Sequence, residues 1–246
     1  ARMLKNRRIG LSVSGIVQAF HKHGVRTILQ WLDQGYEEVC ELDKKFSDWL
    51  AVPKSLKKTT VKPSGTLSLL VGATPGVHYP ESEYYIRRVT LAMSSPLVST
   101  IKAAGYTVRP YVTDPEKTYV IDIPVHETNF HKSKYDVSMW EQLEIVAKMQ
   151  RYWADNAVSN TITFKKEEAD QIAMALELYE DRVKSLSFLP LGKKDHGYED
   201  APYEAITKEE YIEMSKDLTE LDFSGILGVG NQEASKDYCD GDSCTV

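Results

Sequence analysis

The sequence predicts an α/β fold, because short β-branched runs alternate with longer runs that carry apolar residues at helical spacing. Residues 59–62 form such a strand-like run, and residues 67–71 follow with helix-like spacing. Later, a strand-like run at residues 156–164 lies between helical patterns at residues 138–154 and 166–183. Strands joined by helices are the expected result.

Composition narrows the class of protein. With 246 residues, the chain is long enough to bury a core, and its length favours one or two domains. Its 30 basic and 36 acidic residues give a net charge of −6 without a concentrated basic face, so direct DNA binding is not indicated. No apolar run reaches the length that spans a membrane. Three cysteines in a chain of this length favour a reducing, cytoplasmic setting over a disulfide scaffold.

The beginning of the chain combines basic residues with a semi-apolar run at residues 9–20. Ser12, Ser14 and Gln18 interrupt this run, and no small-residue cleavage pattern follows it, so we do not interpret it as a signal peptide. We expect a helix over residues 9–20 that is ended by Gly24. Because the chain does not open with Met, we also expect a segment that begins within a larger fold.

A long helix is predicted over residues 25–50, ending before Pro53. Cys40 has no His or basic cluster next to it, and we interpret it as a buried, inert thiol. The apolar stripe beside it comprises Ile28, Leu32, Tyr36, Val39, Leu42, Phe46 and Trp49.

A turn of Pro, Ser, Gly and Thr then joins the strand at residues 59–62 to the helical run at residues 67–71. Gly65 lets the backbone approach a bound group, and nearby hydroxyls and free N–H groups can bind an anion. The turn lacks the spacing of a P-loop or a dinucleotide-binding loop, so an ordinary capped turn remains open as the alternative. The candidate binding residues are Pro63, Ser64, Gly65, Thr66, Leu67 and Ser68.

The sequence predicts mainly strands in the middle of the chain. His78 follows a turn-rich link, where a hydrogen-bonded structural histidine is favoured over a ligand. Residues 84–91 alternate as a strand, and residues 96–104 read as a short helix. Residues 107–112 and 117–125 are two strands that we expect to pair as a hairpin.

A helix from Ser138 to Ala154 is predicted by a capping box formed with Glu141. Its inner stripe comprises Met139, Leu143, Val146, Met149 and Trp153. The helix at residues 166–183 is expected to turn four residues inward: Ile172, Ala173, Leu176 and Tyr179.

The last elements are a strand at residues 185–191 and a helix that begins at Thr207 with a second capping box. From Ser224 on, glycines, acids and small residues replace any periodic pattern, which predicts a flexible tail. Cys239 and Cys244 in this tail can close a small disulfide ring and reopen it by thiol exchange. Their spacing differs from C-x₂-C, and two exposed thiols without a function remain the alternative.

These motifs carry a resemblance to a known family. The run from Lys62 to Leu70, continued by residues 74–78, resembles the substrate-phosphate loop of adenosylcobalamin-dependent (class II) ribonucleotide reductases of the ribonucleoside-triphosphate reductase type. Residues 6–11 resemble the family's helix before that loop, residues 155–159 resemble its last barrel strand, and residues 239–244 resemble its C-terminal redox pair. The resemblance keeps its order over nearly the whole chain.

The resemblance implies that residues 1–223 are the C-terminal part of the reductase α/β barrel domain and residues 224–246 its flexible redox tail. It implies a ribonucleoside triphosphate substrate, adenosylcobalamin as cofactor, and a thiyl radical that starts the reaction. Cys239 and Cys244 would re-reduce the active site and receive electrons from thioredoxin or a similar dithiol donor. In the family the radical cysteine lies upstream, so this chain is expected to need the missing N-terminal part and to be inactive alone.

Three alternatives stay open. A class I reductase large subunit carries paired tyrosines in the strand that corresponds to residues 158–163, and this sequence has none there. A class III reductase needs a radical glycine near its C-terminus; Gly228 and Gly230 lie in that region, but the cysteine pair beyond them fits a redox tail better. A phosphate-binding module without chemistry would keep the loop and would not need the two tail cysteines.

Overall fold

The computed structural model describes residues 5–65, 67–192 and 200–224. The chain divides into two compact units. The first unit comprises Ala1–Pro80 and Thr128–Lys194, and the second comprises Glu81–Glu127 and Asp195–Val246. The predicted boundary between a barrel domain at residues 1–223 and a tail at residues 224–246 falls at the edge of the described residues and stays a prediction.

Parallel strands form the framework of the first unit. Strand β1 (Arg8–Ser12) pairs with β2 (Lys57–Thr60), and β6 (Ile162–Phe164) pairs with β7 (Phe188–Pro190). A parallel bridge between Val61 and Val158 continues β2 toward the second pair. Parallel strands need long crossover connections, and here these connections are helical.

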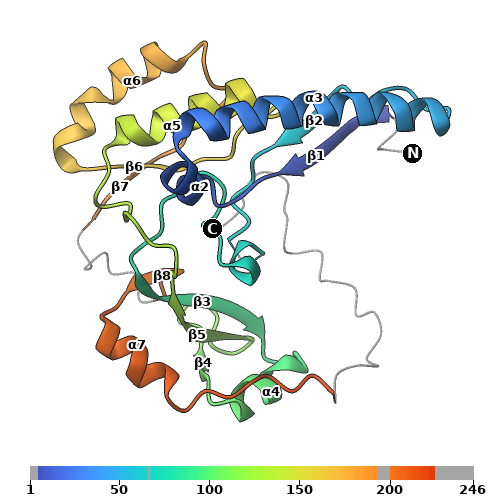
Figure 1. The fold of residues 1–246 in the computed structure, drawn as a ribbon. Helices are drawn as coiled ribbons and strands as arrows, with labels where there is room; N and C mark the ends of the chain where they lie inside the picture. Colours follow the sequence, from blue (N-terminus) through green and yellow to red (C-terminus); the bar gives the residue numbers. More distant parts are fainter. Residues whose placement is uncertain (1–4, 66, 193–199, 225–246) are drawn as a thin grey trace. The chain divides into compact units, whose positions relative to one another are not determined.

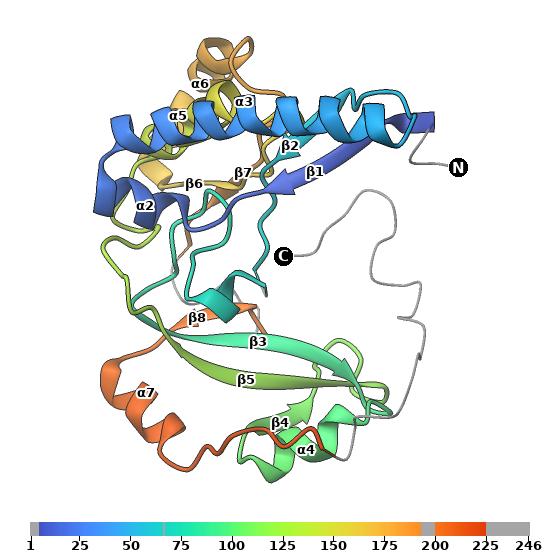
Figure 2. The ribbon, with the colours of Figure 1, turned by 45° about the vertical axis from the view of Figure 1, so that its right-hand side comes forward.

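Helices α3 (Val25–Trp49), α5 (Met139–Tyr152) and α6 (Ile172–Tyr179) lie on one side of these strands (Figure 1, Figure 2). The shorter α2 (Ile16–His23) precedes α3. Two 3₁₀ helices, η1 (Ser68–Val71) and η2 (Lys166–Gln171), complete the elements of this unit.

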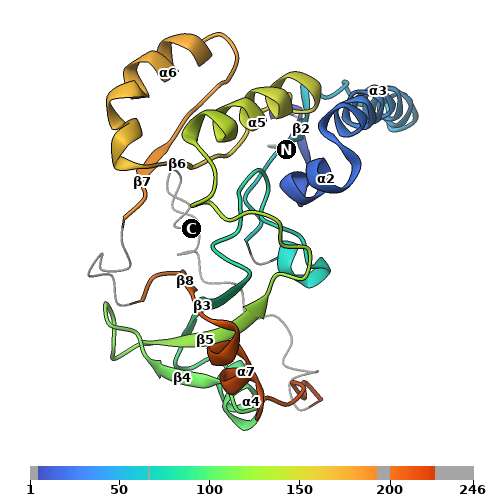
Figure 3. The same cartoon turned by 60° about the vertical axis from the view of Figure 1, so that its left-hand side comes forward.

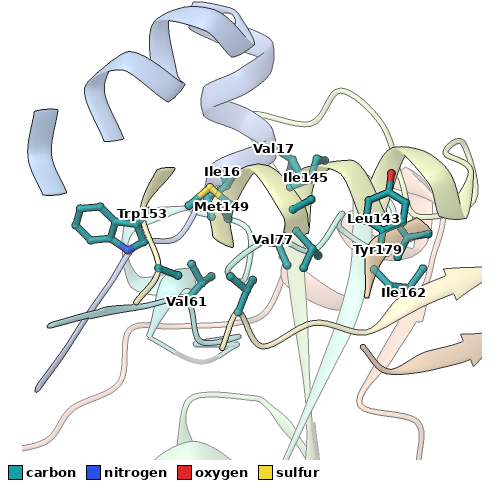
Figure 4. Packing of buried hydrophobic residues seen from close by; sticks show 14 of the residues in the cluster. Ile16, Val17, Val61, Val77, Leu143, Ile145, Met149, Trp153, Ile162 and Tyr179 are labelled. Carbon is teal, nitrogen blue, oxygen red and sulfur yellow. The ribbon is translucent and has the colours of Figure 1, made fainter. Parts of the chain in front are cut away.

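The core of the first unit is built around α5 (Figure 4). All five residues of the predicted inner stripe of this helix are buried. They pack with Ile16 of α2, Val61 after β2, Ile162 of β6 and Tyr179 of α6. The helix begins where predicted, since Ser138 Oγ accepts the Glu141 N–H at 3.2 Å. The helical period of the sequence was therefore a sufficient guide to this face.

The predicted helix at residues 9–20 is wrong in its first half. Residues Arg8–Ser12 form strand β1, and the helix begins only at Ile16. Gly15 has a φ of 71°, a left-handed conformation that breaks the helical path. The apolar spacing misled because pairing of β1 with β2 is a long-range interaction that local periodicity does not contain.

Two predicted apolar stripes are only partly buried. In α3, Ile28 is buried, whereas Phe46 and Trp49 near its end are 48% and 68% exposed. In α6, Tyr179 is buried, but Leu176 is 48% exposed. The last turns of α3 therefore keep these apolar side chains at the surface of the described residues.

The second unit is a four-stranded antiparallel sheet (Figure 3). Its strand order is β4-β5-β3-β8. The strands are β3 (Tyr84–Ala92), β4 (Thr107–Pro110), β5 (Thr118–His126) and β8 (Tyr203–Ala205). The predicted hairpin is confirmed by the antiparallel pairing of β4 with β5. Helices α4 (Leu97–Ala103) and α7 (Lys208–Ser215) lie on the same side of this sheet.

Charged side chains link the strands of this sheet. Arg88 on β3 contacts Asp122 on β5 at 2.9 Å and forms an ion pair with Glu204 on β8. Arg109 on β4 forms an ion pair with Asp200, whose second carboxylate oxygen accepts the Val112 N–H at 3.0 Å. The predicted capping box at the start of α7 is present. Among the described residues, no helix is both long and apolar enough to cross a membrane.

Candidate phosphate-binding loop

The candidate loop leaves the sheet of the first unit directly after β2. Pro63, Ser64 and Gly65 lead to Leu67 and the 3₁₀ helix η1, and Thr66 lies outside the described residues. Ser64 has a φ of 49°, a left-handed conformation that is uncommon for a residue other than glycine. Such a conformation turns the chain sharply, and it is found more often at functional sites than elsewhere.

Hydrogen bonds within the loop fix this turn. The Ser64 carbonyl accepts the Ser68 N–H at 2.9 Å and the Ser68 hydroxyl at 2.7 Å. Ser68 is buried, so its hydroxyl shapes the loop from within. The Ser64 hydroxyl lies 2.5 Å from the Ser14 hydroxyl. The predicted loop has three hydroxyl residues, Ser64, Thr66 and Ser68. Thr66 lies outside the described residues and Ser68 is buried, so the hydroxyl at the bend is that of Ser64.

The segment that follows η1 returns toward the start of the loop. A Cβ atom on Gly76 would lie 2.6 Å from the Lys62 carbonyl oxygen, and Gly76 has a φ of 51°. Only glycine therefore permits this close approach of two backbone segments. Gln18 holds the same return segment, because its Oε1 accepts the Thr74 N–H at 3.0 Å and its Nε2 donates to the Gly72 carbonyl at 3.2 Å.

His78 connects the return segment to the strand region before β6. Its Nε2 lies 3.0 Å from the Thr161 backbone nitrogen, which donates to it, so Nδ1 carries the proton and donates to the Pro75 carbonyl at 3.0 Å. Burial lowers the pKa of His78, although the Pro75 carbonyl opposes this shift. The structural interpretation of this histidine is confirmed by its two hydrogen bonds.

The apolar residues of η1 and its flanks lie at the surface of the described chain. Leu67 is 69% exposed, Leu70 is 80% exposed, and Val71 is 79% exposed. Leu67, one of the predicted binding residues, therefore stands outward rather than in the core. The described part of the loop presents the Ser64 hydroxyl at its turn and exposed apolar side chains next to it.

The strand region at residues 156–163 runs beside β2 and Val61. The Asn156 N–H donates to the Thr59 carbonyl at 3.0 Å, and the Ser159 N–H donates to the Val61 carbonyl at 2.9 Å. Val158 and Ile162 are buried, and Thr163 is held by Gln142. This confirms a strand-like path for the region, although only Ile162–Phe164 forms regular strand β6.

Two hollows lie in the first unit, one beside α2 and α5 and the other beside β1 and β2. One, of about 320 Å³, is lined in part by Gln18, Thr74, Tyr79 and Lys148, and the Thr74 hydroxyl is buried without a hydrogen-bond partner in the described structure. The other, of about 360 Å³, is lined by Ile9, Gly10, Thr60, Lys62, Asn156 and Ala157. Within the described residues, no group of His, Cys, Asp or Glu could hold a metal ion.

Two of the three cysteines lie outside the described residues. Cys239 and Cys244, the predicted redox pair, lie outside the described residues. Cys40 is a free thiol of intermediate exposure, so it is less buried than the sequence predicts. It lies on α3, close to Tyr36, whose hydroxyl donates to Asp155 at 2.8 Å. Burial, followed by this bond to Asp155, raises the pKa of Tyr36.

Side chains far from the candidate loop in the sequence hold it in place, and the sequence does not predict these contacts. Ser12 Oγ accepts the Lys62 N–H at 3.0 Å, and Ser14 and Gln18 make the contacts given above. In the sequence, Ser12, Ser14 and Gln18 are recognisable only as polar interruptions of an apolar run. Their position just before a predicted helical run is visible in the sequence, but it does not identify the residues that they contact.

No family model matches the sequence. The fold of this chain is similar to that of a solved structure. The solved structure is a B12-dependent (class II) ribonucleotide reductase, which matches with a TM-score of 0.74 and 34% identity over 89% of this chain and 34% of that one. The described fold is therefore that of part of a ribonucleotide reductase, and the predicted α/β fold class with a partial reductase barrel is confirmed.

Curated relatives narrow this class to one family. The chain is 44% identical to an adenosylcobalamin-dependent ribonucleoside-triphosphate reductase of Euglena gracilis over 98% of this chain and 34% of that protein. It is 41% identical to a probable enzyme of the same name from Dictyostelium discoideum over 99% of this chain and 32% of that protein. The chain is thus homologous to the adenosylcobalamin-dependent ribonucleoside-triphosphate reductases and spans about a third of their length.

Proposed function

We propose that this chain is part of an adenosylcobalamin-dependent enzyme that converts ribonucleoside triphosphates to 2′-deoxyribonucleotides. The observation that carries the proposal is the 44% identity over 98% of the chain to a reductase of that name. A fold that agrees with a B12-dependent reductase at a TM-score of 0.74 supports it independently of the names. Because the chain spans a third of its relatives, the activity belongs to an assembly that includes the missing N-terminal part.

In this proposal, Pro63, Ser64, Gly65, Thr66, Leu67 and Ser68 form the substrate-phosphate loop. Three features support it: the left-handed turn at Ser64, the hydroxyl at that turn, and the loop's position after a parallel strand. Ligands of open α/β sheets bind beyond the carboxyl ends of the strands. Phosphate oxygens accept hydrogen bonds, and a hydroxyl or an N–H group donates them without adding charge.

We assign Cys239 and Cys244 to electron transfer. Reduction of one ribonucleotide requires two electrons. The tail dithiol would give these electrons to an active-site disulfide by thiol exchange, leaving the active site as two thiols and the tail as a disulfide. Thioredoxin or a similar dithiol protein would then reduce the tail. Such cycling fits a reducing compartment, so the cytoplasm is the proposed location.

Adenosylcobalamin is assigned to the assembled enzyme and to no residue of this chain. When bound, it would supply the radical that converts an upstream cysteine to a thiyl radical. The hollows of about 320 and 360 Å³ match the small end of ligand pockets, whereas a corrin is far larger than a drug-sized ligand. The described residues therefore do not fit the cofactor by themselves.

One alternative is a class I reductase subunit, which would carry a tyrosine pair in the strand at residues 158–163. The described residues there are Val158, Ser159, Asn160, Thr161, Ile162 and Thr163. Val158 and Ile162 are buried in the core, and Asn160 bonds to backbone carbonyls of its own unit. This strand is built for packing, which favours the class II proposal.

The test is reconstitution with the missing N-terminal part, adenosylcobalamin and thioredoxin. Ser64→Ala should raise the KM for the nucleotide by about tenfold or more, because a charge-assisted hydrogen bond contributes about 1.5–3 kcal/mol. Cys239→Ser should abolish turnover with thioredoxin and spare a single turnover. Ser99→Ala, on α4 of the second unit, is the control. Deoxyribonucleotide formation that is unchanged in both variants would refute the two assignments.

A further inference from the structure

The segment from Ser12 to Gln18 contacts both arms of the candidate loop. We infer that Ser14 and Gln18 are positioning residues that hold the phosphate-binding loop in its binding conformation before a nucleotide arrives. This inference rests on the proposed function of the loop. It assigns a role to the polar residues that interrupt the apolar run near the start of the chain.

Gln18 holds the return arm at two points. Its Oε1 accepts the Thr74 N–H at 3.0 Å, and its Nε2 donates to the Gly72 carbonyl at 3.2 Å. The Gly15 N–H donates to the Thr74 carbonyl at 2.8 Å, so both backbone groups of Thr74 are bound by the beginning of α2. A carboxamide is required for this pair of contacts, because one atom must accept while the other donates.

Gly15 makes room for the Gln18 amide. A Cβ atom on Gly15 would lie 3.1 Å from Gln18 Oε1 and 3.3 Å from the Ala73 side chain. Gly15 also has a φ of 71°, which other residues rarely adopt. The backbone at the start of α2 is thus shaped so that Gln18 and the return arm can meet.

Ser12 and Ser14 hold the incoming arm. Ser12 Oγ accepts the Lys62 N–H at 3.0 Å, and Ser14 Oγ lies 2.5 Å from Ser64 Oγ. A phosphate oxygen only accepts hydrogen bonds, so Ser64 must donate its single proton to the ligand. Ser14 must then donate to Ser64. This orients the Ser64 hydroxyl toward the ligand rather than toward its neighbour.

The chemistry of this clamp suits an anion. Its serine hydroxyls, carboxamide and backbone N–H groups are uncharged, so they fix the loop without repelling a polyphosphate. A loop that is ordered before binding loses less conformational entropy when the ligand arrives. Gln18 and Ser14 should therefore affect nucleotide affinity through loop order, without touching the nucleotide.

The first experiment compares the chain with its Gln18→Met variant, which keeps the volume and loses both hydrogen bonds. Amide hydrogen exchange should become about tenfold faster at residues 62–74, because each net hydrogen bond contributes about 0.5–1.5 kcal/mol. Titration calorimetry with a ribonucleoside triphosphate should show a dissociation constant raised by about three- to tenfold. Gln30→Met, at an exposed glutamine of α3, should change neither quantity.

Ser14 is tested with Ser14→Ala and Ser14→Thr. The alanine variant should weaken triphosphate binding by about tenfold, and the threonine variant, which keeps the hydroxyl, should restore most of it. Unchanged exchange in Gln18→Met, faster exchange with unchanged affinity, or equal affinities of the two Ser14 variants would overturn the clamp. If neither the unsubstituted chain nor its assembly with the N-terminal part binds the triphosphate, the proposed function fails, and hydrogen exchange alone then decides whether Gln18 orders the loop.

Discussion

Two parts of this molecule hold irregular backbone in place by different chemistry. In the first unit, the candidate loop is bound by neutral groups: serine hydroxyls, the Gln18 amide and the neutral imidazole of His78. In the second unit, residues 200–204 are bound by Arg88 and Arg109 together with carboxylates. The neutral groups add no charge to the loop, whereas in the second unit paired charges link neighbouring strands.

The difference also sets how each part responds to a change. A buried ion pair leaves an uncompensated charge when one partner is removed, which costs more than the loss of a neutral hydrogen bond. We therefore expect the largest effects of substitution in the second unit and the sharpest pH response near the loop.

Arg88→Met should destabilise the second unit by about 3–5 kcal/mol, because it removes the nearer partner of the buried Asp122 carboxylate, leaving Arg109 at 3.6 Å, and the donor to the Ala201 carbonyl. The Arg88 and Asp122 side chains are only 9% and 12% exposed. Denaturant unfolding, followed by hydrogen exchange in β3 and β5, measures the loss. The control is Lys216→Met, which removes an exposed pair with Glu213 and should leave stability unchanged. Equal stabilities of the two variants would contradict the prediction.

Gly76→Ala should destabilise the first unit by about 2–3 kcal/mol, since it adds an overlap with backbone to a left-handed conformation. The new Cβ atom would lie 2.6 Å from the Lys62 carbonyl oxygen. Gly72→Ala is the matched control, because Gly72 has a φ of 62° and nothing within 4 Å of its Cβ position. It should cost only about 1 kcal/mol. A similar loss in both variants would show that the close approach contributes nothing.

The loop region should weaken at a higher pH than the second unit. Burial lowers the pKa of His78, so its contribution is present above the unfolded value of about 6.5 and is lost as the pH falls from there toward the lower folded value. Burial raises the pKa of Asp200, but the Val112 N–H and Arg109 lower it by more than burial raises it. The pKa of Asp200 therefore lies below its ordinary value. Its contribution is therefore lost only below a pH of about 4.

Hydrogen exchange, corrected for the intrinsic pH dependence, measures both responses in one experiment. Amides near Thr161 and residues 72–78 should lose protection between pH 6.5 and 5, while β3 and β5 keep theirs. His78→Gln should remove the first response, because its side chain does not titrate. If both regions lose protection at the same pH, the difference between the neutral and the charged network does not determine their pH response.

The elements that the sequence predicted well are those in which neighbouring residues decide the outcome. The stripe on α5, the Ser138 cap and the capping box of α7 depend on contacts within a few residues, and all are present. The hairpin of β4 and β5 follows from two alternating runs with a short turn. By contrast, strand β1 was predicted as helix, since its pairing partner β2 lies far along the chain.

The candidate loop shows the same division between features set by neighbouring residues and features set by distant ones. The composition of residues 63–68 indicated an anion-binding turn, and its order with the other motifs indicated the reductase family. The sequence did not reveal that Ser14 would lie beside Ser64, 50 residues away, or that Gln18 would hold Thr74, 56 residues away. Nor did it show that Phe46 and Trp49 would stay at the surface.

The sequence by itself determined the helices with strong periodicity, their caps and the chemical character of the loop, because these depend on side chains a few positions apart. Only the tertiary structure decided that Ser12, Ser14 and Gln18 form the support of that loop. Their partners are chosen by the parallel pairing of β1 with β2, which places two distant segments side by side. Such long-range pairing is fixed by the packing of the whole unit, and no local pattern records it.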